Sequence, residues 1–243
     1  MSFGRKILAR LRQLIGRVDR TIAVSDEVAR RFTGVPGAGR IRTVAPLGPA
    51  PLVRTPAAQV RAALGVPAGG HLVVTAARLH PQKGLLDLVE AADLLRREVE
   101  GLRWVVLGEG PQRGELEALL AARGLGDVVH LAGSRPSVAD ELAAADVVAV
   151  TSRWESGPLV VLEALALGRP IVATAVGLVP DIVDPLAGMV VPVGDPAAMA
   201  RALAEVLARG PAGSGGGGRV GRYGPEHLVP PIEAVYREVL DPR

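Results

Sequence analysis

The chain has 243 residues, of which 49% are hydrophobic and 22% charged, with a formal net charge of +3 and no cysteine. This composition excludes a disordered chain, and the lack of cysteine excludes disulfides, thiolate nucleophiles and cysteine-ligated metal sites. No apolar run approaches the ~20 residues that span a bilayer, no signal-peptide pattern opens the chain and the net charge is small, so we expect a cytoplasmic protein without a nucleic-acid partner.

The first 58 residues predict two helices, a short apolar segment and a linker. A basic amphipathic helix is expected over residues 5–20, because apolar residues recur there at helical spacing between six Arg and Lys residues. It either packs on a protein core or lies on an anionic membrane surface, and both interpretations stay open. The apolar segment 21–24 precedes Ser25, which can cap a second helix. Residues 34–58 are rich in Pro and Gly and are typical of a linker.

From about residue 70, patterns typical of strands and helices alternate strictly. Short runs rich in Val and Leu are apolar on both faces, which favours buried parallel strands. These strands are expected at 71–76, 103–107, 128–131, 147–150, 171–174 and 189–192. Helices are expected near 85–99, 114–123, 137–145, 158–167, 179–184 and 196–208. The alternation predicts an α/β fold with a doubly wound parallel sheet, whose ligand lies in the loops after the strands.

The C-terminal end of the chain departs from this alternation. Residues 210–218 consist mainly of glycine and predict a flexible linker. Apolar residues between 232 and 240 then recur at helical spacing and predict a final amphipathic helix. We therefore divide the chain into an N-terminal segment, 1–52, a central domain, 53–209, and a C-terminal segment, 210–243.

The loop after the first of the alternating strands carries two cations, Arg78 and Lys83, just before a predicted helix. Side-chain charge, free backbone N–H groups and the positive end of a helix dipole together suit a diphosphate. The alternative is a pair of solvated surface cations. Lys6 and Lys83 are the two lysines of an arginine-rich chain, and the presence of Lys83 in such a background favours a functional role.

Glycine-containing turns follow the next two strands. Residues 108–114 nearly match the dinucleotide-binding fingerprint, but the spacing to the third glycine is one residue too long and the motif does not open the sheet. We therefore discount NAD as a ligand. Gly133 and Ser134 close the third strand, where exposed backbone can meet a flat base, although turns after strands often hold these residues for steric reasons alone.

The segment 151–165 contains two carboxylates. Glu155 lies in the loop after a strand, and Glu163 is expected about two turns into the following helix. Gly157 lets the backbone approach a ligand, and Pro158 is expected at the first helical position. Carboxylates accept hydrogen bonds from sugar and ribose hydroxyls. The alternative makes Glu155 a capping acid and Glu163 a charge on the helix surface.

Together these loops resemble the retaining GT-B glycosyltransferases of family 4, over about residues 18–209 and again in the last helix. The most specific element is the pair of glutamates with seven residues between them, followed by residues 164–174, and the Arg78 and Lys83 loop matches as well. The resemblance implies that the central domain is the Rossmann-like, nucleotide-sugar-binding half of a GT-B fold. The N-terminal segment is then a remnant of the acceptor domain, and the last helix is the C-terminal crossover helix.

The resemblance also implies a role for each candidate residue. Arg78 and Lys83 would hold the donor diphosphate and neutralise charge on the leaving group, and Glu155 would contact hydroxyls of the donor sugar. The other implied donor contacts are Ser156, Gly157, Pro158 and Leu159 at the sugar and phosphate, Glu163 at the ribose, and Gly133 and Ser134 beside the base. No cofactor and no metal are implied, and the sequence contains no Asp-x-Asp motif.

The sequence departs from the family pattern chiefly at its N-terminal end. Family members carry roughly another 150 residues there, which hold the acceptor site, and residues 1–33 resemble only the last helix, strand and helix of that domain. The final helix normally packs on it and is expected here to have little to cover. The loop 177–181 also differs, having lost one glycine and shortened its acid.

Three functions are compatible with these features. The first is a glycosyltransferase that uses a UDP-, GDP- or ADP-sugar and a glycan, lipid or small-molecule acceptor, with the acceptor domain supplied by a separate chain. The second is a binding module that holds a nucleotide sugar without turnover, and the third is a truncated, inactive product. Because the chemistry requires two domains to close over the donor, we expect the isolated chain to bind donor but to be weakly active or inactive.

Overall fold

The structure, a computed structural model, describes residues 2–46, 48, 51–210 and 223–240. The chain divides into two units, one formed by Met1–Leu47 with Gly221–Arg243 and the other by Gly48–Val220. The predicted glycine linker, 210–218, lies outside the described residues except for Gly210. The predicted boundaries at residues 52 and 209 stay a prediction.

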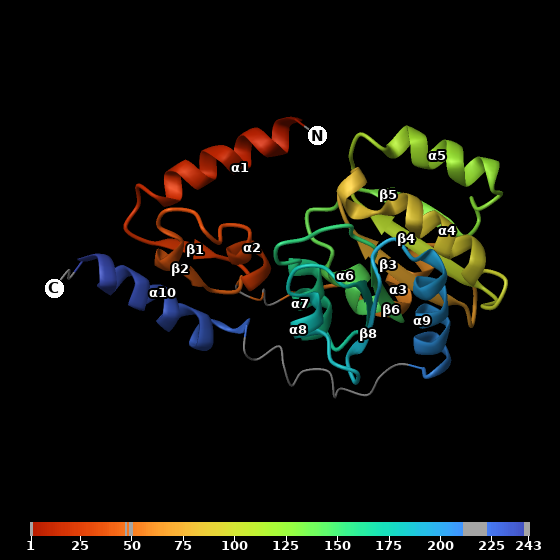
Figure 1. Ribbon diagram of the computed structural model, residues 1–243. Coiled ribbons are helices and arrows are strands. Elements are labelled where there is room, and N and C mark those ends of the chain that lie inside the picture. The colour runs from red at the N-terminus through yellow and green to blue at the C-terminus, as the bar shows by residue number, and fades with distance from the viewer. Residues whose placement is uncertain (1, 47, 49–50, 211–222, 241–243) are drawn as a thin grey trace. The chain divides into compact units, whose positions relative to one another are not determined.

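The larger unit is built on a six-stranded sheet in the order β5-β4-β3-β6-β7-β8, with every neighbouring pair parallel (Figure 1). The strands are β3 (His71–Ala76), β4 (Leu102–Leu107), β5 (Val129–Gly133), β6 (Val147–Val150), β7 (Ile171–Thr174) and β8 (Gly188–Val191). This confirms the predicted α/β fold. The first three strands run to one side and β6 returns to the other side of β3, so the order reverses between β3 and β6.

Helices cover both faces of this sheet (Figure 1). On one face lie α4 (Leu85–Leu95), α5 (Arg113–Ala122) and α9 (Pro196–Ala208). On the other lie α3 (Ala57–Ala63), α6 (Ala139–Ala144) and α7 (Leu159–Ala166), and the short α8 (Val179–Ile182) follows β7. Sequence analysis missed α3, because only Val60 of this seven-residue helix is buried and no apolar period marks it.

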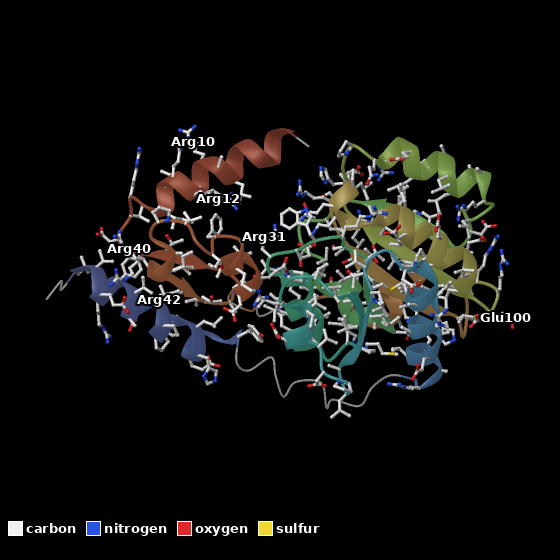
Figure 2. All side chains as sticks on the ribbon, viewed as in Figure 1. Arg10, Arg12, Arg31, Arg40, Arg42 and Glu100 are labelled. Carbon is white, nitrogen blue, oxygen red and sulfur yellow. The ribbon has the colours of Figure 1, made fainter. Side chains whose placement is uncertain are left out.

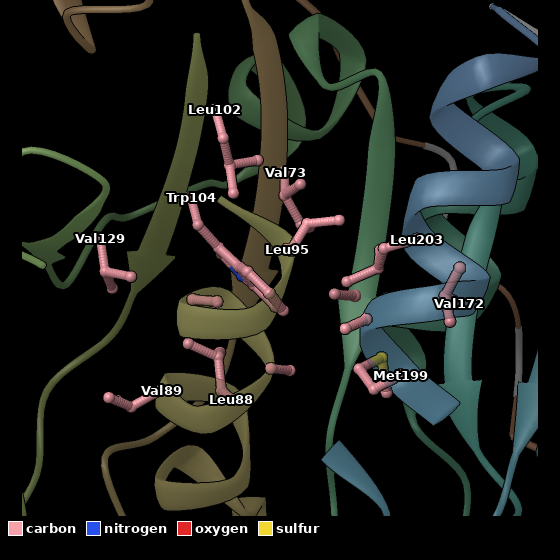
Figure 3. Packing of buried hydrophobic residues seen from close by; sticks show 14 of the residues in the cluster. Val73, Leu88, Val89, Leu95, Leu102, Trp104, Val129, Val172, Met199 and Leu203 are labelled. Carbon is pink, nitrogen blue, oxygen red and sulfur yellow. The ribbon is translucent and has the colours of Figure 1, made fainter. Parts of the chain in front are cut away.

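The largest core fills the space between the sheet and helices α4 and α9 (Figure 3). Trp104 of β4 is fully buried there, and its indole N–H donates to Thr75 Oγ1 at 3.0 Å. The Thr75 hydroxyl in turn donates to the carbonyl of Ala149 on β6 at 2.8 Å. Every donor in this buried series is therefore satisfied. The contacts fix β4, β3 and β6 relative to one another and so fix the loops at their carboxyl ends.

The smaller unit contains a two-stranded parallel sheet. It comprises α1 (Ser2–Ile15), β1 (Thr21–Ala23), α2 (Asp26–Arg30), the 3-10 turn η1 (Ala38–Arg40), β2 (Ile41–Thr43) and α10 (Pro225–Leu240). The Ser25 hydroxyl accepts a hydrogen bond from Val28 N at 3.2 Å, which confirms the predicted cap. The helix predicted at 5–20 ends earlier, at Ile15, before Gly16. No helix in the described part of the chain is both long and apolar enough to cross a membrane.

One expectation for the smaller unit is wrong in part. The predicted linker 34–58 contains β2, whose Ile41 pairs in register with Thr21 of β1, a long-range contact that local composition does not reveal. In the last helix only Leu228 and Val235 are buried among the described residues, and its Glu238 carboxylate accepts from Arg20 at 2.5 Å and from Arg42 at 3.3 Å. The Arg20 hydrogen bond, with the charge of both arginines, lowers the pKa of Glu238.

Candidate functional site

The loops that follow β3 and β6 meet at the carboxyl edge of the sheet, where the strand order reverses. The Thr151 hydroxyl donates to the carbonyl of Lys83 at 2.8 Å, and Arg153 N donates to the carbonyl of Gln82 at 2.8 Å. Gln82 returns a hydrogen bond from its side-chain amide to the carbonyl of Trp154 at 3.1 Å. Ligands of open parallel sheets bind at such reversals, so these two loops define the candidate site.

Gly84 makes the close approach of the two loops feasible. Its φ is +62°, and a Cβ at this position would lie 2.1 Å from the carbonyl oxygen of Thr151. A side chain is therefore excluded both by backbone conformation and by space. The preceding turn is fixed by His80, whose Nδ1 accepts from Gln82 N at 3.3 Å.

Lys83 and Glu155, both predicted as catalytic, form an ion pair between Nζ and Oε1. Their side chains are 18% and 10% exposed, so most of the pair is removed from water. The buried hydroxyl of Ser152 donates to the same Oε1 at 2.7 Å. Glu155 Oε2 has no hydrogen-bond partner among the described residues. One carboxylate oxygen is thus held by the protein, and the other can accept from a ligand.

Arg78, the other predicted cation, is exposed on the loop after β3. Its guanidinium forms neither an ion pair nor a hydrogen bond with any residue that the structure describes. The structure therefore places Arg78 on the same loop as Lys83 but does not join it to the Lys83–Glu155 pair. A solvated cation beside a mostly buried one adds positive potential to this edge of the sheet.

Glu163 is the fifth residue of α7, just over one turn from the helix start rather than the expected two. The helix begins at Leu159, and Pro158 is its N-cap with an extended ψ of 104° instead of its first helical residue, which accounts for part of the difference. Glu163 is half-buried, and burial raises the pKa of its carboxyl group. Within the described chain the carboxylate has no hydrogen-bond partner, which is unusual for a group partly withdrawn from water.

The remaining predicted donor contacts lie around these residues at varying exposure. Ser156 and Gly157 are partly exposed, and Leu159 is 48% exposed. Gly133 ends β5, where its carbonyl accepts from Gly108 N at 2.9 Å, and Ser134 beyond it is exposed. The structure shows no direct contact between the Gly133 turn and the Lys83–Glu155 pair. The two are connected through the loop after β4, where Leu79 N donates to the carbonyl of Glu109 at 3.0 Å.

The loop 177–181 packs on the site although its sequence departs from the family pattern. Gly177 has a φ of +53°, and a Cβ on it would lie 2.6 Å from the carbonyl oxygen of Glu155. The Thr174 hydroxyl, at the end of β7, donates to the carbonyl of Ser152 at 2.6 Å. The segment that carries Glu155 is therefore held from both neighbouring strands.

Sequence reasoning gave no role to Thr151, Ser152 or Thr174, although their hydroxyls form the site's internal hydrogen bonds. The available signal was local. All three residues stand at or just beyond the carboxyl end of a strand, and Ser152 precedes Glu155 by three residues. No cluster of three or more potential metal ligands occurs within the part of the chain that the structure describes.

Comparison with known proteins gives a consistent result. The family model described as "Glycosyl transferases group 1" matches residues 57–212. The D-inositol 3-phosphate glycosyltransferase of Xylanimonas cellulosilytica is 38% identical over 212 residues, which cover 81% of this chain and 50% of that protein. The chain spans about half the length of these curated relatives.

Two solved structures share the fold. Sucrose-phosphate synthase from Thermosynechococcus elongatus matches with a TM-score of 0.82 at 28% identity, over 97% of this chain and 62% of that one. HepE of Anabaena, in complex with UDP-glucose, matches with a TM-score of 0.84 at 22% identity, over 98% of this chain and 68% of that one. The likeness to HepE is evidence of the fold alone.

Proposed function

The chain belongs to the glycosyl transferases group 1 family and has a GT-B-type fold, and from this premise we propose that it binds a nucleotide sugar at the carboxyl ends of β3 and β6. The observation that carries the proposal is the Lys83–Glu155 pair. It places a cation suited to a phosphate directly beside a carboxylate whose second oxygen suits a sugar hydroxyl. Glu163, a half-buried carboxylate without a partner in the described chain, is suited to the ribose.

In the proposed reaction, the bond between the anomeric carbon and the diphosphate oxygen breaks and a bond to an acceptor hydroxyl oxygen forms, with release of the acceptor's proton. Charge develops on the departing diphosphate. Lys83 and Arg78 stabilise that charge, which lowers the barrier to bond breaking. Glu155 orients the sugar through its hydroxyls. We propose retention of configuration, as in the family 4 enzymes that the motifs resemble, and no metal or other cofactor.

The residues named above are proposed to bind the donor, and none of them is proposed to bind the acceptor. About half of the length of these relatives is matched by this chain, so we propose that a glycan, lipid or small-molecule acceptor binds a separate domain or chain. Donor binding without robust transfer is the expected behaviour of this chain by itself. A binding module that never turns over is the alternative function.

Calorimetric titration with UDP-glucose, GDP-mannose and ADP-glucose tests the proposal. We expect one of the three to bind, and Lys83→Ala to weaken it about tenfold or more, as for loss of a charge-assisted hydrogen bond. Failure of the wild-type chain to bind any of them rejects both the transferase and the binding module. Rapid sugar transfer by this chain alone would contradict the proposed need for a second domain.

A second proposal concerns α1, which we assign to peripheral contact with the inner face of the membrane. Residues 1–47 carry ten Lys and Arg against three Asp and Glu. On α1, Leu11 and Leu14 are 42% and 46% exposed beside Arg10 and Arg12 (Figure 2). Exposed leucines among arginines suit the interface of an anionic bilayer. We expect the chain to bind phosphatidylglycerol vesicles, and this binding to weaken as the salt concentration rises. Equal binding to neutral vesicles would mean that α1 packs on protein instead of contacting an anionic membrane.

A further inference from the structure

A series of hydrogen bonds runs from the end of β7 to the carboxylate of Glu155. The Thr174 hydroxyl donates to the carbonyl of Ser152 at 2.6 Å, and the Ser152 hydroxyl donates to Glu155 Oε1 at 2.7 Å. Thr174 and Ser152 are 4% and 2% exposed. Because both residues are buried, neither hydroxyl can turn towards solvent or reach a ligand. Their hydrogen bonds therefore serve the protein's own geometry.

Glu155 Oε1 accepts from two donors of different character. Lys83 lies on a flexible side chain that is 18% exposed, whereas Ser152 is fixed in the loop after β6. A bound diphosphate competes with Glu155 for the Lys83 ammonium, because phosphate oxygens are strong acceptors for it. When Lys83 turns to the diphosphate, the Ser152 hydrogen bond is the remaining side-chain contact that fixes Glu155 within the described residues.

We infer that Ser152 is a positioning residue for Glu155, and that Thr174 positions Ser152. With Oε1 held by the serine, the open Oε2 stays directed at a hydroxyl of the donor sugar while Lys83 engages the diphosphate. This inference rests on the proposed function, since it assigns Glu155 to the sugar and Lys83 to the phosphate. Ser152 contacts Glu155, which binds the sugar, and not Lys83, which binds the diphosphate. Loss of the serine hydroxyl should therefore weaken recognition of the sugar and leave recognition of the diphosphate intact.

The test measures dissociation constants for three pairs of probes by calorimetry: UDP-glucose with UDP, GDP-mannose with GDP, and ADP-glucose with ADP. For the pair that binds, the ratio of the nucleotide-sugar constant to the nucleotide constant is compared between variants. Ser152→Ala is expected to raise this ratio about tenfold, the effect of one hydrogen bond to a charged group. The constant for the nucleoside diphosphate alone should change less than about twofold.

Conservative variants distinguish a role of Ser152 and Thr174 in positioning Glu155 from a general role in folding. Ser152→Thr keeps a hydroxyl and should restore the wild-type ratio, whereas Thr174→Val should raise it as Ser152→Ala does. The matched control is Ser25→Ala in the smaller unit, because Ser25 is 1% exposed and its hydroxyl also makes one local hydrogen bond. This control should leave the ratio unchanged even though it removes a helix cap.

A spectroscopic measurement checks that the diphosphate still reaches Lys83. The sequence contains two lysines, Lys6 and Lys83, so protein labelled with ¹³C at lysine Cε gives two side-chain signals. Addition of the nucleoside diphosphate should shift the Lys83 signal in both the wild-type chain and Ser152→Ala. Lys83→Arg assigns the signal by removing it.

Each result of these measurements either supports or overturns the positioning role of Ser152. An unchanged ratio in Ser152→Ala overturns the inference, and so does an equal loss of nucleotide and nucleotide-sugar affinity, which would make Ser152 a general structural residue of the loop. Equal wild-type affinities for a nucleotide and its sugar, unaltered by Glu155→Gln, would remove Glu155 from the sugar and overturn the inference while nucleotide binding stands. Absence of all binding to the wild-type chain instead removes the proposed function itself.

Discussion

Lys83 and Glu155 form a mostly buried ion pair although 72 residues separate them in the chain. The pair joins the loop after β3 to the loop after β6, the two strands between which the sheet order reverses. A buried pair is costly to break, because removal of one partner leaves the other as an uncompensated charge. Loss of either partner should therefore destabilise the two loops, and the proposed donor would have to separate the two groups.

Removal of Lys83 should destabilise the chain more than removal of both partners. Lys83→Met leaves Glu155, which is 10% exposed at its side chain, without its cation, and should lower the free energy of unfolding by about 3 kcal/mol. The double variant Lys83→Met with Glu155→Gln removes both charges and should recover at least about 1 kcal/mol of that loss. Urea denaturation of the four proteins in this cycle measures the coupling.

The control for this cycle is an ion pair of the same unit whose cation is exposed and whose acid, Asp93, keeps Arg96 as a second partner. Arg97 pairs with Asp93 while remaining 67% exposed, so Arg97→Met should cost less than about 0.5 kcal/mol. Additive effects of Lys83→Met and Glu155→Gln would show that the two groups do not interact in solution. The ion pair would then contribute nothing to the stability of the chain.

Ionisation of Glu163 should make the chain less stable as the pH rises above 4.5, the ordinary pKa of a glutamate. Burial raises the pKa of Glu163 in the folded protein above its unfolded value. The folded state then holds the proton to a higher pH than the unfolded state does, so the stability associated with the protonated form is complete below the unfolded pKa and is lost as the pH rises through the folded pKa. Glu163→Gln removes this dependence and should be more stable than the wild type at pH 7 while binding nucleotide sugar less tightly.

Urea denaturation of both proteins between pH 4 and 7 checks the stability prediction, and calorimetry checks the binding. Glu100→Gln is the matched control, because Glu100 is exposed (Figure 2). The wild type and the Glu100 variant should show parallel pH profiles, whereas the stability of the Glu163 variant relative to the wild type should increase as the pH rises. A Glu163→Gln variant that binds the nucleotide sugar as tightly as wild type would exclude the ribose contact.

Trp154 should report donor binding through its fluorescence. The chain has two tryptophans, of which Trp104 is fully buried and Trp154, next to Glu155, is 48% exposed. Acrylamide should therefore quench Trp154 selectively, and a bound nucleotide sugar should protect it. Trp154→Phe should retain the emission of Trp104 and lose the ligand-dependent change. A ligand response that survives in Trp154→Phe would place the binding event near the core tryptophan instead.

Sequence patterns were sufficient for the central strands of the larger unit, β4, β3, β6 and β7, because they are largely buried on both faces, which forces a run of apolar residues. In β3, for example, Leu72, Val73 and Val74 are all fully buried. The loops after these strands could be located for the same reason, since parallel strands end at one edge. The meeting of Lys83 and Glu155 follows from the strand order, which the alternation of elements predicts only in outline.

Features that depend on long-range contacts could not be predicted. The pairing of Ile41 with Thr21 forms a strand in a segment whose Pro and Gly content is typical of a linker. Thr174 looks like an ordinary residue at a strand end, and its hydrogen bond to the carbonyl of Ser152 crosses from β7 to the loop after β6. The start of α7 was misplaced by one residue because Pro158 is compatible with both the N-cap and the first helical position.

Gly84→Ala should disrupt the site far more than an alanine at a glycine of the same backbone conformation. Gly84 and Gly124 have φ values of +62° and +60°, but a Cβ at residue 84 would lie 2.1 Å from the carbonyl of Thr151, whereas one at residue 124 meets nothing within 4 Å. Gly124→Ala therefore costs only the strain of a left-handed alanine, about 1 kcal/mol. Gly84→Ala adds a clash that must push the loop after β3 away from the loop after β6 and so separate Lys83 from Glu155.

Thermal unfolding should show the larger loss of stability for Gly84→Ala, and calorimetry should show nucleotide-sugar binding lost in that variant but retained in Gly124→Ala. Equal losses for the two variants would mean that conformational strain alone accounts for the glycine and that the loops do not meet as described.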